Sequence, residues 1–410
     1  MTFVRRALSQ GELDVLATAH ERLLTGRPGG RRLSLKFADL NGLDLSGRDL
    51  REVDFTGCAL EDAKLVAARL DAAVLFCCDL RGADFSRASM VRADLRGASL
   101  RGASLMDADL TRADFREGVL AVPHATRGLA AVRHETRRGV ADGATFAGAT
   151  LNGSLLDGVT AFRADFSDCS MKGARLTGAN LRDANLNGAL LEDAAVDGAN
   201  LAGAQLKGAV LTGVAVERAR TERADLTGAL RAPTPEALEQ AGALLERALD
   251  ANAWTESRGV FGAPAQFDGA DLRPLGDRLR DLKMPGLSGR GACFVGMDLR
   301  GVALQGACLE DADLRGCDLR GADLRAARLS RALLHKADLR GALLEPLPLG
   351  GGRSAPVLLI GAGLRYARLE GAALAGARLD GADVSGARID PGALDDTQRL
   401  SLAPAPAAAA

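Results

Sequence analysis

The chain has 410 residues and a formal net charge of only −1, although 26% of its residues are charged. Such a balance argues against a protein whose main task is to coat nucleic acid or to bind an acidic membrane surface. Hydrophobic residues make up 47% of the chain, which is enough for a large core, but aromatic residues make up only 3%. Small and mid-sized aliphatic side chains must therefore fill the interior, and this composition favours a narrow, regular core.

The sequence predicts neither a secretory signal nor a membrane span. Two basic residues, Arg5 and Arg6, lie near the start of the chain, but no apolar segment of the signal-peptide type follows them. No stretch reaches the ~18 uncharged apolar residues that a membrane-spanning helix needs. We therefore expect a cytoplasmic protein, in whose reducing surroundings the seven cysteines are not expected to form disulfides.

The first predicted element is a helix over residues 9–25. Ser9 and Glu12 form the signature of a capping box, in which two side chains bond reciprocally to the backbone at a helix start. Leucines recur after them at helical spacing, and a segment that contains glycine and proline ends the helix. We place this helix in an N-terminal cap that spans residues 1–32.

From Leu35 onward the chain repeats every five residues. Each fifth position from Leu35 to Leu120 is large and apolar, a small residue often stands two positions before it, and the residue between them is usually polar, often Asp. A helix would spread these positions around its circumference, whereas strand alternation places the large and the small residue on the same side. We therefore predict a solenoid over residues 33–230 that turns these two side chains inward and the other three outward.

An interruption at residues 121–145 separates this run from a second one, which goes from Phe146 to Leu226 in a new phase. We predict that the interruption is a loop, and loops are where a uniform repeat scaffold can carry specificity. The loop is rich in arginine, which favours docking to an acidic protein surface through contacts with carboxylates. A tolerated insertion, kept soluble by its arginines, is the other interpretation. The candidate interaction residues are Arg127, Arg133, Arg137 and Arg138.

A second helical cap or linker is predicted at residues 231–265. Thr234 is a suitable N-cap, and Pro235 fits the first helical position because its missing N–H would be unpaired there in any case. Trp254, the one tryptophan of the chain, lies in this segment. It is a secondary candidate for protein interaction, and packing of the cap is the other interpretation.

A further run of apolar centres goes from Phe294 to Leu349 and, after a glycine-rich interruption, from Leu364 to Leu394. The two runs have the same phase of the five-residue period, so we join them into one second solenoid. The boundaries that we assign are a second solenoid at 266–398, a loop at 350–358 and a disordered tail, rich in Ala and Pro, at 399–410.

Several of the five-residue units match the pattern A(D/N)LXX. On these units the chain resembles the pentapeptide-repeat family. The resemblance implies an all-β solenoid, in the form of a right-handed quadrilateral β-helix with four pentads in each coil. Because a helix followed by a solenoid occurs twice, we predict two tandem rods with short α-helical caps; one continuous rod with a helical insertion is the alternative. The matching units include Ala179-Asn180-Leu181, Ala184-Asn185-Leu186 and Ala322-Asp323-Leu324.

No pattern in the sequence is typical of a catalytic centre, a cofactor site or a metal site, so we predict a protein that is not an enzyme. Cys58 and Cys78 occupy the small inward position and are interpreted as core residues. They are one coil apart, a spacing that disulfide geometry permits but a reducing compartment disfavours. His335 falls on a solvent position, and the periodic Asp residues are interpreted as the outward polar position of the repeat.

Two functions from different classes remain. The first is a non-enzymatic scaffold or adaptor that presents rigid β-helical faces and loops to a protein partner of unknown identity. The second follows from the resemblance, because some pentapeptide-repeat proteins protect or inhibit DNA gyrase with an acidic rod that resembles duplex DNA. A duplex carries one charge per ~1.7 Å, whereas outward Asp residues here are balanced by Arg two places later, as in Asp94 and Arg96. We therefore favour the scaffold, expect no direct nucleic-acid binding, and keep the topoisomerase modulator as the alternative.

Overall fold

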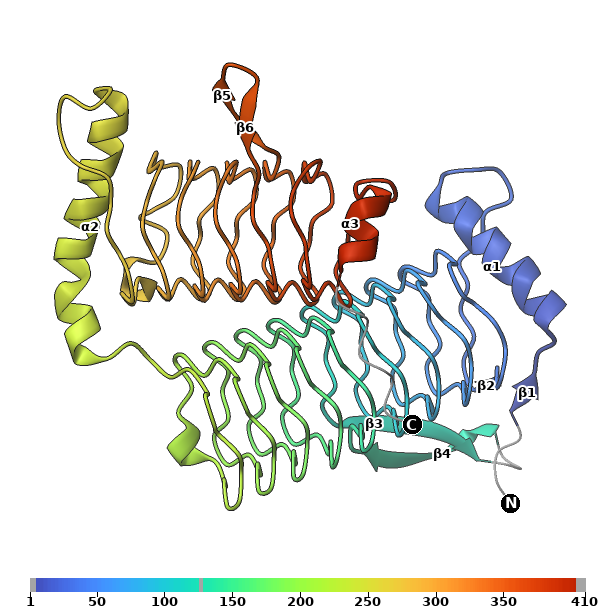
Figure 1. The fold of residues 1–410 in the computed structure, drawn as a ribbon. Coiled ribbons are helices and arrows are strands. Elements are labelled where there is room, and N and C mark those ends of the chain that lie inside the picture. The colour runs from blue at the N-terminus through green and yellow to red at the C-terminus, as the bar shows by residue number, and fades with distance from the viewer. Residues whose placement is uncertain (1–4, 125–127, 403–410) are drawn as a thin grey trace. The chain divides into compact units, whose positions relative to one another are not determined.

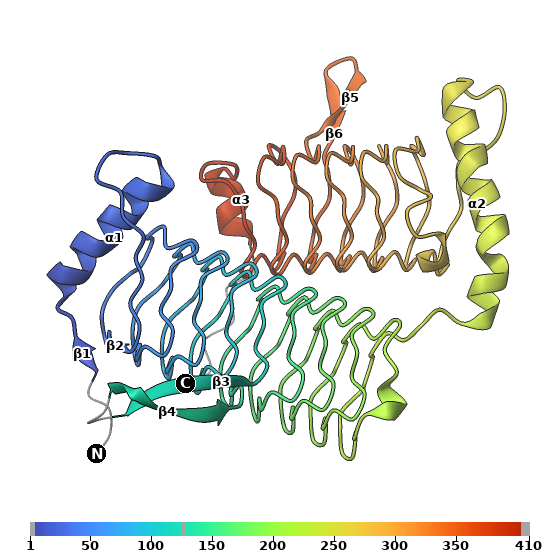
Figure 2. The same cartoon turned by 180° about the vertical axis from the view of Figure 1, so that it is seen from behind.

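The computed structural model describes residues 5–124 and 128–402 and, within them, every side chain but those of residues 122–133. The chain divides into two compact units, Met1–Ala232 and Pro233–Ala410, here called unit 1 and unit 2. In each unit the ribbon winds into a stack of narrow coils (Figures 1 and 2). Each stack encloses its own continuous hydrophobic core.

Each pentad of the coils forms one β-bridge followed by a two-residue turn. Asp94, for example, makes parallel bridges to Val74 in one neighbouring coil and to Asp114 in the other. The next turn has Gly97 at a φ of 68°, a left-handed conformation that glycine adopts without strain. Because bridge partners are 20 residues apart, four pentads make one coil. A turn in every pentad leaves no room for longer strands, so most of the β-structure consists of single-residue bridges rather than of continuous strands.

The five-residue period correctly predicts which residues face the core. Leu95 and Ala93, the large and the small residue of one pentad, are each 1% exposed, whereas Asp94 between them is only half-buried. In the same interior the rings of Phe146 and Phe166 stack with their centroids 4.7 Å apart. The predicted inward and outward positions are therefore confirmed for this pentad.

Unit 1 begins with a short strand and a helix. The strand β1 (Arg6–Ala7) pairs in parallel with β2 (Ala38–Asp39) of the first coil. The helix α1 (Gln10–Leu24) follows, at the end of the stack of coils (Figure 1). The predicted capping box is confirmed, because the side chains of Ser9 and Glu12 each accept the backbone N–H of the other residue.

The interruption of unit 1 is a β-hairpin and not the loop expected at residues 121–145. Its strands, β3 (Gly118–His124) and β4 (Gly128–Arg137), pair antiparallel with Gly118 opposite Arg137. Leu120, expected to be the last apolar centre of the first run, lies on β3. Burial alternates here as in a strand, since Val119 is 54% exposed and Leu120 is 3% exposed, and the pairing of β3 with β4 satisfies the backbone groups of the segment.

The coils of unit 1 resume earlier than the sequence predicted. Val140 already bridges to Ser99 in the coil before the hairpin and to Thr160 in the coil after it. Ala141 takes the position of the large inward residue and is 1% exposed. The inward residue here is small, whereas the next pentad has the large ring of Phe146, which lies edge-on to Phe115 at 6.3 Å between ring centroids. A search for large residues alone therefore misses this pentad.

Unit 2 begins with α2 (Pro235–Glu256), whose predicted N-cap Thr234 accepts the N–H of Ala237. Its side chains close the first coil, since Asn252 accepts the backbone N–H of Lys283 at 3.0 Å. No helix within residues 5–124 and 128–402 is long and apolar enough to cross a bilayer. Two short 3-10 helices interrupt the coils, Val216–Arg218 in unit 1 and Arg273–Leu275 in unit 2.

The interruption of unit 2 is also a hairpin. Its strands are β5 (Leu347–Gly350) and β6 (Arg353–Ala355), so the loop predicted at 350–358 contains the second strand. Leu349, expected to be an apolar centre, lies on β5 and is 56% exposed. The hairpin is short because three glycines at its tip allow the left-handed turn between the two strands.

A third helix closes unit 2 where a disordered tail was expected. The helix α3 (Asp396–Ser401) includes residues 399–401, so the tail predicted from residue 399 is wrong at its start, and residues 403–410 lie outside the described residues. Gln398 is 5% exposed and its amide donates to the carbonyl oxygens of Leu374 and Ala377 at 2.7 and 2.9 Å. These bonds satisfy backbone groups that a further coil would otherwise bond.

Because each unit has a helix and a core of its own, we expect fragments 1–232 and 233–410 to fold separately. Circular dichroism of each purified fragment should show β-structure and a cooperative thermal transition. A fragment 233–410 that stays unfolded beside a folded fragment 1–232 would contradict this prediction, and would favour one continuous rod in which α2 is an insertion.

Candidate protein-interaction surfaces

The hairpin β3–β4 packs on one side of the coils of unit 1 (Figures 1 and 2). Leu120 is 3% exposed and lies over Gly57, where an added Cβ would be 3.6 Å from its Cδ2. Arg137 donates from Nη1 to the carbonyl oxygen of Cys77 at 3.1 Å. The base of the hairpin is therefore part of the packed structure, in contrast to the loop expected at residues 121–145.

The four arginines predicted to dock a partner lie in different environments. Arg137 holds the hairpin in place, since it also pairs with Glu135 at 3.1 Å. Arg138 is exposed immediately after β4. Arg133 lies on β4 with its side chain outside the described set, and Arg127 lies outside the described residues altogether. The docking role of this segment stays a prediction, with Arg138 as its best-placed described residue.

Trp254 is half-buried near the end of α2. The turn that follows the helix folds back on it: the N–H of Gly259 donates to its carbonyl oxygen at 2.8 Å, and the hydroxyl of Ser257 donates to the same oxygen at 3.3 Å. A Cβ added at Gly259 would be 3.5 Å from the indole Nε1. These contacts favour packing of the cap as the main role of Trp254.

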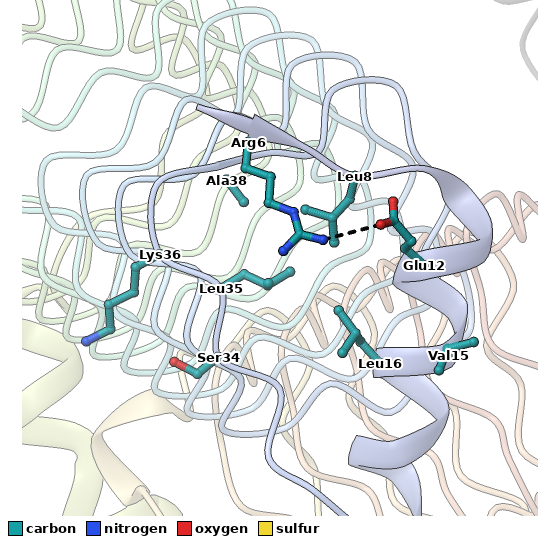
Figure 3. A pocket seen from close by; sticks show the side chains of 9 residues that line it. All are labelled: Arg6, Leu8, Glu12, Val15, Leu16, Ser34, Leu35, Lys36 and Ala38. Carbon is teal, nitrogen blue, oxygen red and sulfur yellow. Dashed lines mark hydrogen bonds and ion pairs between the residues drawn. The ribbon is translucent and has the colours of Figure 1, made fainter. Parts of the chain in front are cut away.

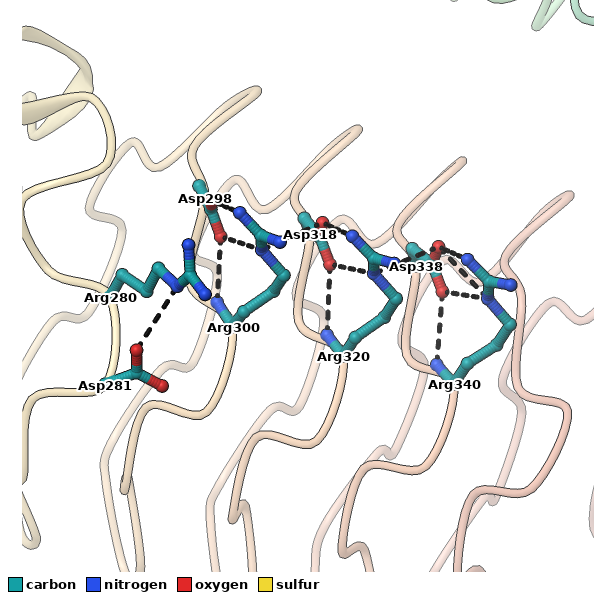
Figure 4. A network of polar contacts seen from close by, with 8 residues as sticks. All are labelled: Arg280, Asp281, Asp298, Arg300, Asp318, Arg320, Asp338 and Arg340. Carbon is teal, nitrogen blue, oxygen red and sulfur yellow. Dashed lines mark hydrogen bonds and ion pairs between the residues drawn. The ribbon is translucent and has the colours of Figure 1, made fainter.

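A ladder of Asp–Arg pairs runs along one side of unit 2 (Figure 4). In each pair Asp Oδ1 accepts the backbone N–H of the Arg two residues later at 3.2 Å, and the guanidinium bonds to both carboxylate oxygens. Pairs in successive coils are also linked, since Nε of Arg300 lies 3.5 Å from Oδ2 of Asp318. The Asp–Arg ladder consists of Asp298–Arg300, Asp318–Arg320 and Asp338–Arg340.

The ladder explains why Asp recurs in the repeat. Its carboxylate caps the turn by accepting the N–H two residues on, and the hydrogen bond from Arg300 holds the pKa of Asp298 below its usual range. The charge of each carboxylate is balanced within its own pentad, so this surface differs from the continuous negative charge of duplex DNA. The same arrangement occurs in unit 1 at Asp79–Arg81, Asp94–Arg96 and Asp114–Arg116.

All seven cysteines are free thiols. Cys58 and Cys78 are 0% and 1% exposed, and their Sγ atoms lie 3.1 and 2.9 Å from the carbonyl oxygens of Leu35 and Phe55. Their interpretation as core residues is confirmed, and burial raises the pKa of Cys58 to about 11. Such thiols remain protonated and unreactive near neutral pH.

Cys308 lies in a different environment from the other thiols. Its Sγ accepts hydrogen bonds from Nε of Arg290 at 2.9 Å and from Nη2 of Arg328 at 3.0 Å. Burial acts to raise the pKa of Cys308, but the hydrogen bonds from the two guanidinium groups outweigh it and the pKa lies below its usual value. The half-buried Cys293 has no such pair, and burial raises its pKa to about 11.

We expect iodoacetamide to alkylate Cys308 before the other thiols of the native chain. The deprotonated thiolate is the nucleophile, and the lowered pKa increases its fraction at neutral pH, whereas the raised pKa of Cys293 decreases it. Peptide mapping by mass spectrometry over a pH series measures the order. Replacing Arg290 by Ala should slow the labelling of Cys308 alone. Faster labelling of Cys293, the more exposed thiol, would show that solvent access rather than ionisation sets the order of alkylation.

His335 does not point freely to solvent as its position in the repeat suggested. It is half-buried over Gly363 of the next coil, where a Cβ would collide with the imidazole ring. Burial, together with the nearby Arg365 and Arg315, lowers the pKa of His335 to about 4. Because Gly363 has no side chain, the imidazole ring can lie against its backbone, a contact that the pentad pattern does not reveal. Across residues 5–124 and 128–402, no three His, Cys, Asp or Glu side chains are grouped to hold a metal ion.

The first coil of unit 1 has no coil before it, so its outward backbone groups need other partners. At Asp39 the partner is β1. At Asp44 it is the side-chain amide of Gln10, which donates to the carbonyl oxygen and accepts the N–H, both at 2.8 Å. At Asp49 the carboxylate of Glu21 accepts the N–H at 3.2 Å. Three of the four sides of this coil are therefore covered.

The fourth side of the first coil, at Ser34, is open. No described residue pairs with the backbone N–H or C=O of Ser34. One coil later the equivalent residue, Asp54, has both partners: its N–H donates to Leu33 at 3.3 Å and its carbonyl accepts from Leu35 at 2.7 Å. Ser34 thus presents an unpaired β-edge.

A groove of about 500 Å³ lies at this open side, between β1, α1 and the first coil (Figure 3). At its rim Arg6 and Glu12 form an ion pair at 3.3 Å, and Figure 3 shows Lys36 extending away from the pair at the other end. None of the residues that line the groove was predicted to be a site residue from the sequence. Its floor and walls include Leu8, Val15, Leu16, Leu35 and Ala38.

The family model for pentapeptide repeats matches the chain in eight copies, which together cover more than half of its residues. The chain therefore belongs to the pentapeptide-repeat family, and the resemblance inferred from the sequence is confirmed. No curated protein sequence matches the chain. The matched segments are residues 32–66, 78–116, 142–178, 174–213, 307–345 and 357–390.

Solved structures similar to this chain include three of the same kind. A pentapeptide repeat protein from the thylakoid lumen of Arabidopsis thaliana shares 26% identity over 36% of this chain and 68% of that chain, with a TM-score of 0.18. HetL, a pentapeptide repeat protein involved in heterocyst differentiation regulation in the cyanobacterium Nostoc sp. strain PCC 7120, shares 20% identity. The match covers 89% of this chain and 94% of HetL, with a TM-score of 0.13. QnrB1, a plasmid-mediated fluoroquinolone resistance protein, shares 18% identity. The match covers 53% of this chain and 96% of QnrB1, with a TM-score of 0.23. TM-scores this low carry no argument about function.

Proposed function

We propose that this protein is a non-enzymatic scaffold, built as two right-handed quadrilateral β-helical rods, that binds another protein at the N-terminal end of unit 1. The observation that carries the proposal is the open side of the first coil, where the unpaired backbone of Ser34 borders an apolar groove. Binding surfaces combine exposed apolar area with unsatisfied hydrogen-bonding groups that a partner can complete.

The sides of the coils are less suited to recognition. In the Asp–Arg ladder every carboxylate bonds to an Arg of its own pentad, so a partner gains little by competing for either charge. The same pairing disfavours the alternative function, a DNA-mimicking modulator of DNA gyrase or another topoisomerase. The hairpin β3–β4 with Arg138 is the second candidate surface. The seven free thiols accord with a reducing compartment, and we propose the cytoplasm.

Affinity capture of the tagged full chain from its native cells, with quantitative mass spectrometry, tests the proposal. The Val15→Trp variant places a large ring in the groove, while Leu23→Trp, also exposed and on α1 but outside the groove, is its matched control. We expect one partner to be lost with Val15→Trp and kept with Leu23→Trp and Arg138→Glu.

Loss of the partner with Arg138→Glu alone would move the binding surface to the hairpin. A partner kept by every variant would contradict both surfaces. Supercoiling assays with purified gyrase, with and without drug, test the alternative: an effect of the full chain at stoichiometric amounts would favour the topoisomerase modulator.

A further inference from the structure

We infer that the groove binds an extended, acidic peptide segment of the partner, which adds to the first coil of unit 1 as an extra β-rung at Ser34. The inference rests on the proposed function and specifies its binding mode. Strand addition of this kind takes its affinity from backbone hydrogen bonds and its specificity from pockets for alternate side chains. The groove supplies the free backbone groups and the apolar pocket. Its charged rim adds a preference for acidic residues in the segment.

The backbone contribution comes from the one uncovered side of the first coil. An added segment in extended conformation can pair with the N–H and C=O of Ser34 as Asp54 pairs with the coil before it. The covered sides show what such pairing looks like, since β1 makes a parallel rung and the Gln10 amide imitates one. An edge with unpaired N–H and C=O groups can pair with an extended segment of another chain.

The specificity pocket is the apolar floor of the groove. Leu8 and Ala38 are buried, whereas Leu16 and Leu35 are only half-buried and Val15 is 70% exposed, so apolar surface remains open to solvent. A cavity of about 500 Å³ accommodates a large aliphatic or aromatic side chain. In an extended segment the flanking residues then point away from the floor, toward the rim.

The rim selects for negative charge. Arg6 and Lys36 have side chains that are 78% and 59% exposed, so each has donors left besides its present ion pair. Among the described residues that line the groove, Glu12 is the one carboxylate, and it is already engaged by Ser9 of the capping box and by Arg6. The described lining therefore has two cations against one carboxylate, although Asp54 beside the groove pairs with Lys36 at 3.2 Å. Carboxylates on either side of the apolar residue fit the remaining donors of Arg6 and Lys36.

The probe is a display library of random octapeptides, selected on the full chain. We expect the selected peptides to share one large apolar residue flanked by Asp or Glu. Fluorescence polarisation with the best peptide should show about a tenfold loss of affinity for Val15→Trp and for Lys36→Glu, and a change below about twofold for the matched control Leu23→Trp. Lys36 has a side chain that is 59% exposed and pairs with the half-buried carboxylate of Asp54, so circular dichroism of the Lys36→Glu variant checks that the fold is kept.

Hydrogen exchange reports the backbone contribution separately. In the free protein the amide of Ser34 should exchange faster than that of Asp54, which is bonded to Leu33. The bound peptide should slow exchange at Ser34, and a peptide with an N-methylated amide beside its apolar residue should lose both the protection and the affinity. Binding without protection of Ser34 would overturn strand addition.

Other occupants give distinct results, each of which overturns the inference. If the chain fills the groove itself, selection on the full chain should yield no such peptide, and peptides should bind only after residues 2–4 are removed. If a second copy fills it, sedimentation should show a dimer that Val15→Trp dissociates. If selected peptides bind Val15→Trp as well as the wild type, the groove is not the site. In that last case a partner still captured by the full chain leaves the scaffold function standing, so the two failures are distinguishable.

Discussion

Replacing Leu95 by Asp is expected to abolish folding of unit 1. Leu95 is 1% exposed, and the residues above and below it in the stack, Leu75 and Phe115, are 0% and 1% exposed. No polar side chain in this column can pair with a carboxylate, and an unpaired buried charge costs more than about 3–5 kcal/mol. That cost is comparable to the whole stability of a typical domain. In calorimetry the transition of unit 1 should disappear while that of unit 2 remains.

The neighbouring replacement Asp94→Asn is the control. The amide oxygen of Asn still accepts the N–H of Arg96, which Asp94 accepts at 3.2 Å. The variant loses the ion pair with the guanidinium, but these side chains are 25% and 44% exposed, and the loss should be below about 1 kcal/mol. Equal melting temperatures for the Leu95 and Asp94 variants would show that the inward and outward positions are wrongly assigned.

The second large effect is expected from Gly139→Ala. Gly139 lies where the hairpin β3–β4 returns to the coils, and an added Cβ would overlap the carbonyl oxygen of Phe115. That backbone is fixed, because the N–H of Phe115 donates to Leu155 at 2.8 Å and its ring is buried. The structure can relax only by moving a coil, so we expect a loss of about 3 kcal/mol or more in the free energy of unfolding of unit 1.

Gly143→Ala separates this collision from the ordinary cost of replacing glycine. Gly143 has a φ of +64°, but a Cβ added there would meet no atom within 4 Å, so the backbone preference alone should cost about 1 kcal/mol. Chemical denaturation of both variants measures the difference. A Gly139 variant no less stable than the Gly143 variant would mean that the hairpin can shift away from Phe115 freely.

Features that depend on neighbouring residues could be predicted from the sequence. The spacing of large residues such as Leu95 fixes which side chains are buried, and the capping box at Ser9 and the N-cap at Thr234 fix where two helices begin. These rules act within a few residues, so one sequence contains all the information that they need.

Features that depend on contacts between coils could not be predicted in this way. Ala141 is inward but small, and its position follows only from the bridges that Val140 makes to the coils before and after it. β1 and α1 cover three sides of the first coil and leave the side at Ser34 uncovered, and the path that they take is set by tertiary packing. The contact between Cys308 and Arg328 could have been predicted from the sequence, because a separation of 20 residues places Arg328 one coil away on the same side.

The way in which the hairpins leave the coils has a practical consequence. Ser99 bridges to Val140 across one hairpin and Arg328 bridges to Leu358 across the other, and in both cases the ladder continues in register. We therefore expect the corner at the hairpin β5–β6, where Leu349 is exposed, to accept foreign sequence without redesign of the core. Because stacked coils are spaced by about 4.8 Å, successive corners along a solenoid are separated by this same distance. The choice of coil would therefore set the position of a displayed epitope or ligand along the axis of the solenoid.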